Sequence, residues 1–272
     1  MIEQLANLKR GIYGIFNNLF ESIPSIPSGA EKIVLVKSIK GENIYYYKIG
    51  KGSKKVIFVG GIHGNEVGTV KLMQELINLL SGTIDYREFC FYLIPCLNID
   101  GYEMAKKHPG YFSGGKTGRF NANNVDLNRN FPTTDFQSKS VWRFGKNWSQ
   151  SKEVFCGNAA SSEPENNALC ELILKENVKI FVAFHNAGSE VMENDHQPSK
   201  ELAKIFSQAT GYKYVTADEW KQLGVTGTAK KWCDENNITY LEIEGNNRWN
   251  SDWSAQKPGI EKVLNYLQVN KF

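Results

Sequence analysis

Four short runs of almost purely apolar residues place the strongest constraint on the fold of this chain. The run 56–59 is Val-Ile-Phe-Val, and Gly60-Gly61 follows it directly. Similar runs lie at 89–97 and 180–184, and the run 238–243 is apolar apart from Thr239 and Glu242. A strand without a polar face must be covered on both sides, as in a parallel sheet between two layers of helices. The sequence therefore predicts an α/β fold around a buried sheet.

Segments with helical spacing separate these apolar runs. One helix is indicated by apolar residues at helical intervals between 70 and 80, and alternation in 31–50 predicts a β-hairpin. Further helices are expected over 164–175, 200–209 and 257–268. Alternating strands and helices predict a single three-layer α/β/α domain, residues 1–272, with a mixed, largely parallel central sheet. Residues 1–30 are expected to form a helical segment packed on this domain.

A polar stretch from about 103 to 162 interrupts this alternation. It is long for a segment without regular structure in a compact domain, and such stretches are usually functional or disordered. Because it contains Trp142, Trp148 and Phe155, we expect an ordered surface loop that packs against the domain.

Composition and charge exclude several classes of function. The 272 residues carry a net charge of +3, which is too weak a basic balance to indicate a nucleic-acid partner. No apolar run approaches about 20 residues, so no membrane span is expected. The N-terminus lacks a signal-peptide pattern, and the five cysteines form no Cys-x-x-Cys pair. These features predict free, mostly buried thiols and a cytoplasmic protein, although a periplasmic location reached by another route stays open.

Two of the four histidines follow apolar runs. His63 comes just after the first run, three residues before Glu66, and His185 comes directly after the run 180–184. In an open α/β sheet, ligands bind beyond the carboxyl ends of the strands. Two imidazoles and a carboxylate there would form a three-ligand site with an open fourth position, as in catalytic zinc sites. Taken singly, each residue could instead belong to a structural turn or to the core. His108 and His196 lie in polar segments and are interpreted as surface residues.

Two acidic residues mark the last apolar run. Glu242 and Glu244 are two residues apart, so on a strand they share a face. Two carboxylates on a buried face are unfavourable unless they serve a cation or a hydrogen-bond network. The alternative interpretation is an exposed edge strand with one polar face.

Two arginines accompany an Asn-rich segment that ends in proline, 123–132. Arg129 lies within it beside Asn128, and Arg119 lies ten residues before Arg129. A planar guanidinium suits a carboxylate or a polarised carbonyl, although isolated arginines are more often surface charges. Ser-Glu-Pro-Glu at 162–165 opens a predicted helix, with proline near the first position and acidic residues in the first turn.

Together these pieces resemble the zinc metallocarboxypeptidase family, the M14 peptidases. GGIHGNE, Arg119 ahead of NVDLNRNFP, SEPE, FHNAG and a late strand closing on glutamate occur in the family's order, over residues 60–245. Within the family, the chain is most similar to the compact bacterial murein peptide amidases, which remove diaminopimelate from γ-D-glutamyl peptides. Trp232-Cys233, ahead of the strand that ends at Glu244, also resembles that subgroup.

The resemblance implies roles for the residues that match the family's motifs. It implies one zinc ion per chain, held by His63, Glu66 and His185. Glu244 would be the general base and acid, and Arg119 would polarise the scissile carbonyl. The implied activity is that of a zinc-dependent metallopeptidase of the carboxypeptidase or amidase type.

The resemblance also bears on the substrate. Asn128 and Arg129 would bind its free carboxylate, so that a terminal peptide or isopeptide bond is cleaved, as in γ-D-glutamyl-diaminopimelate. Many family members have a mobile Tyr shortly before the catalytic Glu, but the segment 224–237 contains none. The murein peptide amidases share this absence, which argues against standard C-terminal peptides. Glu242 stands where the family usually has Thr, and its role stays open.

Two alternatives remain. A zinc-dependent N-acyl-amino-acid deacylase of the succinylglutamate desuccinylase or aspartoacylase type shares the His-Gly-Asn-Glu motif and the Asn-Arg pair. The DLNRNFP and SEPE segments, and the gap of 185 − 66 = 119 residues between Glu66 and His185, favour the peptidase. A non-catalytic binding protein on the same fold would lack a ligand or the base, and none is missing. The expected partner is a small peptide or acyl-amino-acid substrate, and the sequence leaves the oligomeric state open.

Overall fold

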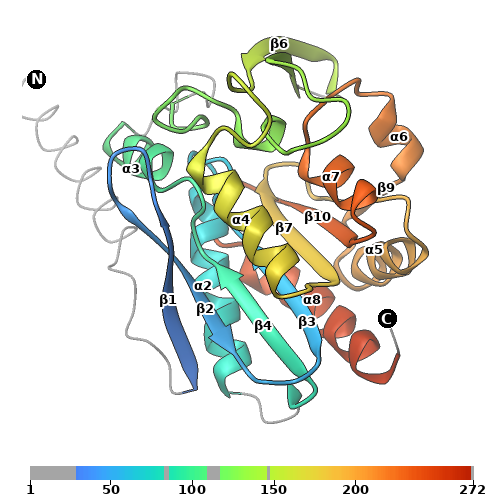
Figure 1. Cartoon of the computed structure of the whole chain (residues 1–272). Helices are drawn as coiled ribbons and strands as arrows, with labels where there is room; N and C mark the ends of the chain where they lie inside the picture. Colours follow the sequence, from blue (N-terminus) through green and yellow to red (C-terminus); the bar gives the residue numbers. More distant parts are fainter. Residues whose placement is uncertain (1–28, 83–85, 109–116, 146–147, 271–272) are drawn as a thin grey trace, which may run out of the picture.

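A mixed sheet forms the centre of the computed structural model, which describes residues 29–82, 86–108, 117–145 and 148–270 (Figure 1). Its strands are β1 (Ala30–Lys37), β2 (Asn43–Ile49), β3 (Lys54–Val59), β4 (Phe89–Ile94), β7 (Ile180–Asn186), β8 (Glu190–Glu193), β9 (Lys213–Val215) and β10 (Thr239–Gly245). The eight strands follow the order β1-β2-β4-β3-β7-β10-β8-β9. The four central strands β4, β3, β7 and β10 are parallel, as predicted, whereas the β1–β2 hairpin and β8 pair with them in antiparallel fashion.

Helices cover both faces of the sheet (Figure 1). They include α2 (Val67–Gly82), α4 (Pro164–Lys175), α5 (Gln197–Thr210), α7 (Ala229–Glu235) and α8 (Trp253–Val269). One apolar core joins α2, α5 and α8 to the face that carries Phe58 and Val182. A second core joins α4 and α7 to the opposite face, which carries Ile57 and Phe181. The three-layer α/β/α architecture predicted from the sequence is therefore confirmed.

Some predicted boundaries need correction. The strand expected over 89–97 ends at Ile94. Pro95 follows it, and because proline has no backbone N–H it cannot continue the hydrogen-bonded ladder. Nearly all of the helical segment predicted for 1–30 lies outside the described residues, and the domain limits stay predictions.

The expectation of an irregular loop over 103–162 is wrong in part. The stretch holds most of α3 (Ile99–Lys107), a 3₁₀ turn η2 (Leu127–Arg129) and two antiparallel strands, β5 (Lys139–Phe144) and β6 (Gln150–Phe155). Trp142 packs against Val154 and Cys156 beneath this hairpin, so the predicted packing holds there. Phe155 is 37% exposed and does not contribute to it. Short polar strands such as Gln-Ser-Lys-Glu-Val-Phe give little periodic signal in a sequence.

Two further sequence expectations concern membranes and thiols. None of the described helices combines the length and the apolar character that crossing a membrane requires. All five cysteines are free, and four of them are buried, as predicted. The cytoplasmic location stays a prediction.

Candidate metal centre and active-site pocket

Three parallel strands bring the predicted site residues to one edge of the sheet. His63 and Glu66 lie on the turn after β3, and His185 and Glu244 are the last residues but one of β7 and β10. The register pairs Glu244 directly with His185 on the neighbouring strand. The turn that carries His63 packs so closely on α3 that a Cβ at Gly64 would lie 2.2 Å from the backbone nitrogen of Tyr102. Only glycine permits this approach.

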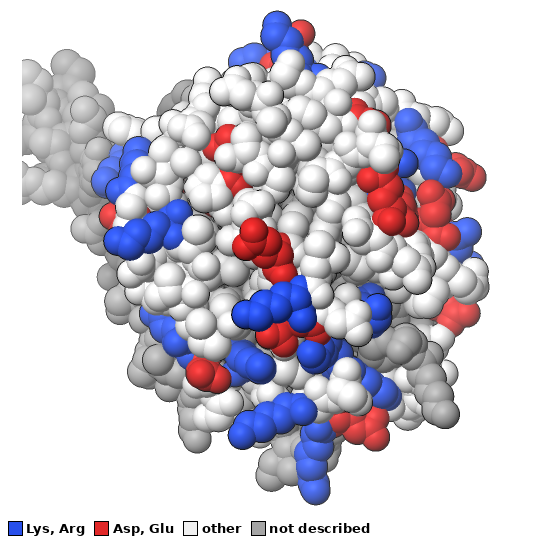
Figure 2. All heavy atoms as spheres, viewed as in Figure 1, with Lys and Arg blue, Asp and Glu red and all other residues white. Residues whose placement is uncertain are grey.

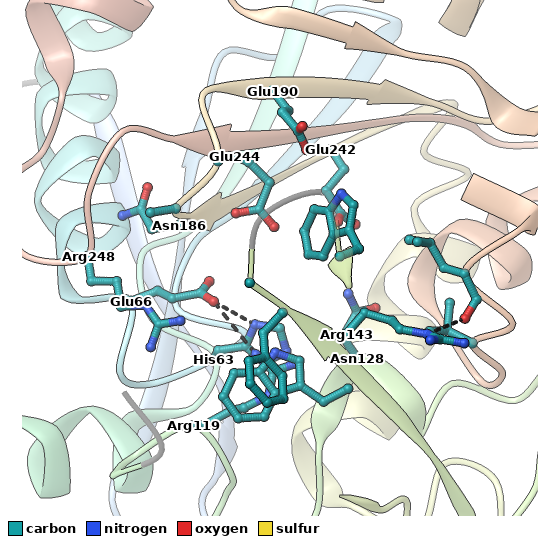
Figure 3. A pocket seen from close by; sticks show the side chains of 18 of the residues that line it. His63, Glu66, Arg119, Asn128, Arg143, Asn186, Glu190, Glu242, Glu244 and Arg248 are labelled. Carbon is teal, nitrogen blue, oxygen red and sulfur yellow. Dashed lines mark hydrogen bonds and ion pairs between the residues drawn. The ribbon is translucent and has the colours of Figure 1, made fainter. Parts of the chain in front are cut away.

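His63, Glu66 and His185 form a buried cluster. Their ligand atoms all lie within 4.8 Å of one another, and none of the three side chains is more than 5% exposed. The Nδ1 atom of His63 lies 2.9 Å from Oε1 of Glu66, and Nδ1 of His185 lies 3.0 Å from Oε2 (Figure 3). The two Nδ1 atoms are 3.1 Å apart. Four potential ligand atoms therefore converge on one point.

This cluster fits a zinc ion. Two imidazoles and a carboxylate are zinc donors, and ligand atoms bound at about 2.0 to 2.1 Å in tetrahedral geometry are about 3.3 Å apart. The observed separations of 2.9 to 3.1 Å are close to that value. Lone pairs that face one another at such distances, without water, are stable only with a cation or protons between them.

Asp126 supports the cluster from outside. Its Oδ1 atom lies 3.2 Å from Nε2 of His63, which directs the Nδ1 atom toward the cluster. Its Oδ2 atom accepts hydrogen bonds from Nε and Nη2 of Arg119, at 3.0 and 2.9 Å. Burial alone would raise the pKa of Asp126, but Arg119 and His63 hold it well below its usual range. The acid therefore stays ionised and aligns both partners.

Arg119 is fixed on three sides. In addition to its bonds to Asp126, its guanidinium lies 4.5 Å from the ring centre of Trp142. Its Nη1 atom is directed to the cluster and lies 3.9 Å from Oε1 of Glu66. This arrangement presents a buried cation beside the candidate metal position.

Negative charge accumulates on the β10 side of the cluster. Burial and the nearby Glu66 raise the pKa of Glu244 to about 8. The Oε2 atom of Glu242 lies 4.0 Å from Nε2 of His185 and accepts a hydrogen bond from the Tyr240 hydroxyl. Burial would lower the pKa of His185, but Glu242 and Glu66 raise it to about 9. The carboxyl groups of Glu66, Glu242 and Glu244 thus lie together beside the two imidazoles, an arrangement that favours a bound cation.

Asn128 and Arg129 lie on η2, beside this cluster. Oδ1 of Asn128 accepts a hydrogen bond from the backbone N–H of Ala229 at 3.0 Å, so its NH₂ group remains for a ligand. Arg129 donates from Nε to the Val141 carbonyl and from Nη1 to the Asn128 carbonyl. Its Nη2 has no hydrogen-bond partner among the described residues, and the side chain borders the pocket.

A cavity of about 350 Å³ opens over these residues (Figure 3). Its polar lining includes His63, Glu66, Arg119, Asn128, Arg129, Glu242 and Glu244. Its outer wall comes from the β5–β6 hairpin and the segment around α6 (Ala217–Lys221), with Trp142, Phe144, Trp148, Trp220, Leu223 and Val225. Figure 2 shows mostly uncharged side chains in the middle of the upper half of the molecule, with charged side chains at its top and on its right. The volume and the aromatic lining suit a small substrate.

The fold brings the seven predicted site residues, together with Glu242, to this one place. Glu242 and Glu244 share a face of a buried strand, as expected, so the edge-strand alternative is wrong. His108 is exposed and His196 precedes α5, so neither joins the site. Glu163 directly precedes α4, and its carboxylate accepts a hydrogen bond from Nδ2 of Asn121 and makes no capping bond to the helix.

Sequence reasoning missed several residues of the pocket. Asp126 lies inside the predicted Asn-rich segment, and its place two residues before Asn128 was the only available signal. Glu190, Arg143 and Arg248 also line the cavity, together with the aromatic wall. These residues stand at no regular sequence distance from the predicted strand ends. Only the folded structure therefore shows that they line the cavity.

Comparison with known proteins assigns the family. The zinc carboxypeptidase (peptidase M14) sequence family matches residues 18–260 of this chain. The chain belongs to this family. It is a hydrolase of the metallopeptidase class, and the cluster of His63, Glu66 and His185 is a site that could hold the metal.

Individual relatives agree with this assignment. Over 215 residues the chain is 26% identical to murein peptide amidase A of Escherichia coli K12, with 76% of this chain and 78% of that protein covered. The structure of the murein-tripeptide amidase from Escherichia coli O157 has a TM-score of 0.66 at 23% identity, covering 92% of this chain and 95% of that one. An aspartoacylase family protein from Mesorhizobium loti has a TM-score of 0.56 at 16% identity, covering 93% and 70%. The fold alone therefore does not separate peptidases from deacylases.

Proposed function

We propose that this hydrolase cleaves a terminal peptide or isopeptide bond next to a free carboxylate, with γ-D-glutamyl-diaminopimelate in murein peptides as the preferred substrate class. The observation that carries the proposal is the meeting, in one cavity, of a three-ligand cluster, the carboxylate of Glu244 and an Asn-Arg pair. These three parts supply a metal position, a base and an anchor for the end of the substrate.

The ligand cluster would hold one zinc ion through His63, Glu66 and His185. A zinc ion supplies Lewis acidity that polarises a carbonyl and lowers the pKa of water to roughly 7. Asp126 keeps His63 in the tautomer whose Nδ1 atom faces the cluster.

Glu244 is the proposed general base and acid. It lies across the cavity from His63 in Figure 3, and its carboxylate has no hydrogen bond among the described residues. Burial and neighbouring carboxylates raise its pKa to about 8, which makes it a stronger proton acceptor than an ordinary carboxylate. Glu244 would take a proton from the attacking water and return it to the leaving amine.

Arg119 would stabilise the negative charge that develops on the scissile carbonyl oxygen. Its fixed guanidinium needs no reorganisation during the reaction, because Asp126 and Trp142 already hold it. Loss of one such donor typically costs about 3 to 4 kcal/mol of transition-state stabilisation.

Asn128 and Arg129 would bind the carboxylate of the leaving residue. The NH₂ group of Asn128 and Nη2 of Arg129 together offer N–H donors of the kind that bind carboxylates. Because this pair lies next to the cluster, a substrate anchored there presents the bond that precedes its last residue.

A deacylase of the aspartoacylase type is the second candidate, since a solved member of that family has a similar fold. Murein peptide amidase A matches over about three quarters of both chains, which supports the peptide substrate. The test therefore compares, side by side, the rates at which the zinc-loaded protein cleaves a panel of substrates. The panel contains γ-D-glutamyl-diaminopimelate, an α-linked dipeptide, and N-acetyl and N-succinyl amino acids.

The expected result is fastest turnover of the γ-D-glutamyl isopeptide, measured as kcat/KM with product identification. Turnover of only the N-acyl amino acids would favour the deacylase. The Arg129→Gln variant should raise KM for the isopeptide and should have little effect when the leaving group lacks a carboxylate.

A further inference from the structure

The cavity has a second cationic end that the proposed reaction does not use. Arg248 lines the cavity from the segment between β10 and α8, whereas Arg129 and Arg143 line it from η2 and β5. In Figure 3, Arg248 lies beside Glu66 and Asn186, and Arg143 lies on the opposite side of the cavity. Guanidinium groups therefore flank the candidate metal centre on two sides.

The segment that carries Arg248 is firmly held. The Arg248 carbonyl accepts a hydrogen bond from the Gly68 N–H at 2.7 Å, at the start of α2. A Cβ at Gly68 would lie 2.0 Å from the carbonyl oxygen of Asn250, so the segment rests directly on the helix. Oδ1 of Asn247 accepts hydrogen bonds from the backbone of Trp249 and Asn250 at 3.0 and 2.8 Å. The backbone on both sides of Arg248 is thus braced.

The order of the binding side chains along the cavity determines which part of a substrate can contact Arg248. If Asn128 and Arg129 anchor the leaving residue and the scissile carbonyl lies at the cluster, the acyl part of the substrate extends toward Arg248. Guanidinium groups bind carboxylates through paired N–H donors. An α-linked peptide has no free carboxylate beside its scissile carbonyl, but a γ-glutamyl isopeptide has one on the carbon chain of its acyl group.

We infer that Arg248 binds a carboxylate carried by the acyl part of the substrate and thereby selects amides of dicarboxylic acids such as γ-glutamyl isopeptides. The inference rests on the proposed function, because it needs the leaving residue at Asn128 and Arg129. It adds a specificity-determining residue at the other end of the cavity.

The wall between the two cationic ends supports this division. Glu190, Glu242 and Glu244 line the cavity from β8 and β10. A substrate carboxylate placed along this wall meets like charges, so anionic groups are confined to the two ends. A substrate with two separated carboxylates matches this distribution of charge.

The test compares two substrates that differ only in the acyl-side carboxylate. The first is γ-D-glutamyl-diaminopimelate with a free α-carboxylate on the glutamyl residue, and the second has an α-carboxamide there. The zinc-loaded protein should prefer the free acid by about 10- to 100-fold in kcat/KM. Arg248→Gln should reduce this preference to within about threefold, and Arg248→Lys should retain part of it.

Arg87→Gln is the matched control, because Arg87 is exposed and lies just before β4, at the opposite edge of the sheet. It should keep the full preference. Zinc stoichiometry checks that each variant is folded. Equal hydrolysis of both substrates, or an undiminished preference in Arg248→Gln, would overturn the inference and leave the proposed function standing. Hydrolysis of neither substrate would overturn both.

Discussion

The two sides of the cavity are built in different ways. The inner side consists of His63, Glu66, His185 and Glu244, which lie at or just after the carboxyl ends of parallel strands. The outer side consists of aromatic residues from the β5–β6 hairpin and from the segment around α6. Backbone ladders position the first set, and side-chain contacts position the second. The catalytic groups and the apolar wall of the cavity therefore belong to separate structural units.

The central sheet fixes the positions of the residues on the inner side. Strands β3, β7 and β10 are hydrogen-bonded neighbours, and helices bury both of their faces. Because a slip in register by one residue would turn Glu244 into a core, the pairing of Glu244 with His185 is strongly fixed.

The outer side depends on a few contacts between two polar segments. Nε of Arg143 on β5 donates to the Leu223 carbonyl at 2.9 Å, and the N–H of Thr226 donates to Oγ of Ser140 at 3.1 Å. Such a wall can change its shape and lining without disturbing the sheet. We expect changes on the inner side to alter kcat and changes on the outer side to alter KM.

The largest effect is expected from Glu244→Gln. This change keeps the size of the side chain and removes the proton acceptor, so kcat should fall by roughly 10²- to 10⁴-fold while the zinc content stays unchanged. Initial rates at saturating substrate, with metal analysis of the same samples, measure both quantities. Glu75→Gln, on the exposed face of α2, is the control and should match the wild type. Unchanged hydrolysis by Glu244→Gln would refute the assignment of the base.

A smaller effect is expected from Trp148→Ala on the outer side. The indole is half-buried in the cavity wall, and loss of its apolar contact with substrate should raise KM by about tenfold with kcat within about twofold. Phe155→Ala changes an exposed aromatic residue of the same hairpin that does not line the cavity, so it should change neither value. A large fall in kcat for Trp148→Ala would contradict the division between the two sides.

A third effect, on stability and not on activity, concerns the loop around Asn121, which precedes η2. Glu165 on α4 lies under this loop, with Oε2 3.4 Å from Nδ2 of Asn121, and burial raises its pKa to about 7. Because the ordinary value is 4.5, the folded chain binds the proton more tightly, and stability is lost as pH rises from about 4.5 to about 7. Glu165→Gln should remove this loss, which is at most about 3 kcal/mol.

Urea unfolding of both proteins at pH 5 and pH 8 measures the difference. The variant should gain stability relative to the wild type at pH 8 and little at pH 5. Glu171→Gln, on the exposed side of the same helix, should show no such dependence. An equal difference at both pH values would contradict the raised pKa.

The contrast between the two sides explains what could be predicted from the sequence. Apolar runs such as 56–59 and 180–184 have the length and the composition of strands buried on both faces, and polar residues just after them identify the sheet edge. His63, Glu66, His185 and the pair Glu242 and Glu244 could therefore be singled out from the sequence. The resemblance to the metallopeptidases selected Glu244 as the base and gave roles to Arg119, Asn128 and Arg129.

The outer wall could not be predicted for physical reasons. The strands β5 and β6 are short and mostly polar, so they carry no clear period, and Trp142, Trp148 and Trp220 reach the cavity only through tertiary packing. The sequence does not identify Asp126 as a partner of His63 and Arg119, because these residues lie 63 and 7 positions away from it in the chain. Glu190 and Arg248 likewise have no neighbouring motif.

Zinc stoichiometry tests the central claim most directly. Equilibrium dialysis against buffered zinc should give one tightly bound ion per chain for the wild type, and none under the same conditions for a His63→Ala, His185→Ala double variant. His196→Ala is the matched control, because this histidine lies outside the cluster, and it should bind one ion. Binding of zinc by the double variant with wild-type stoichiometry and affinity would contradict the account.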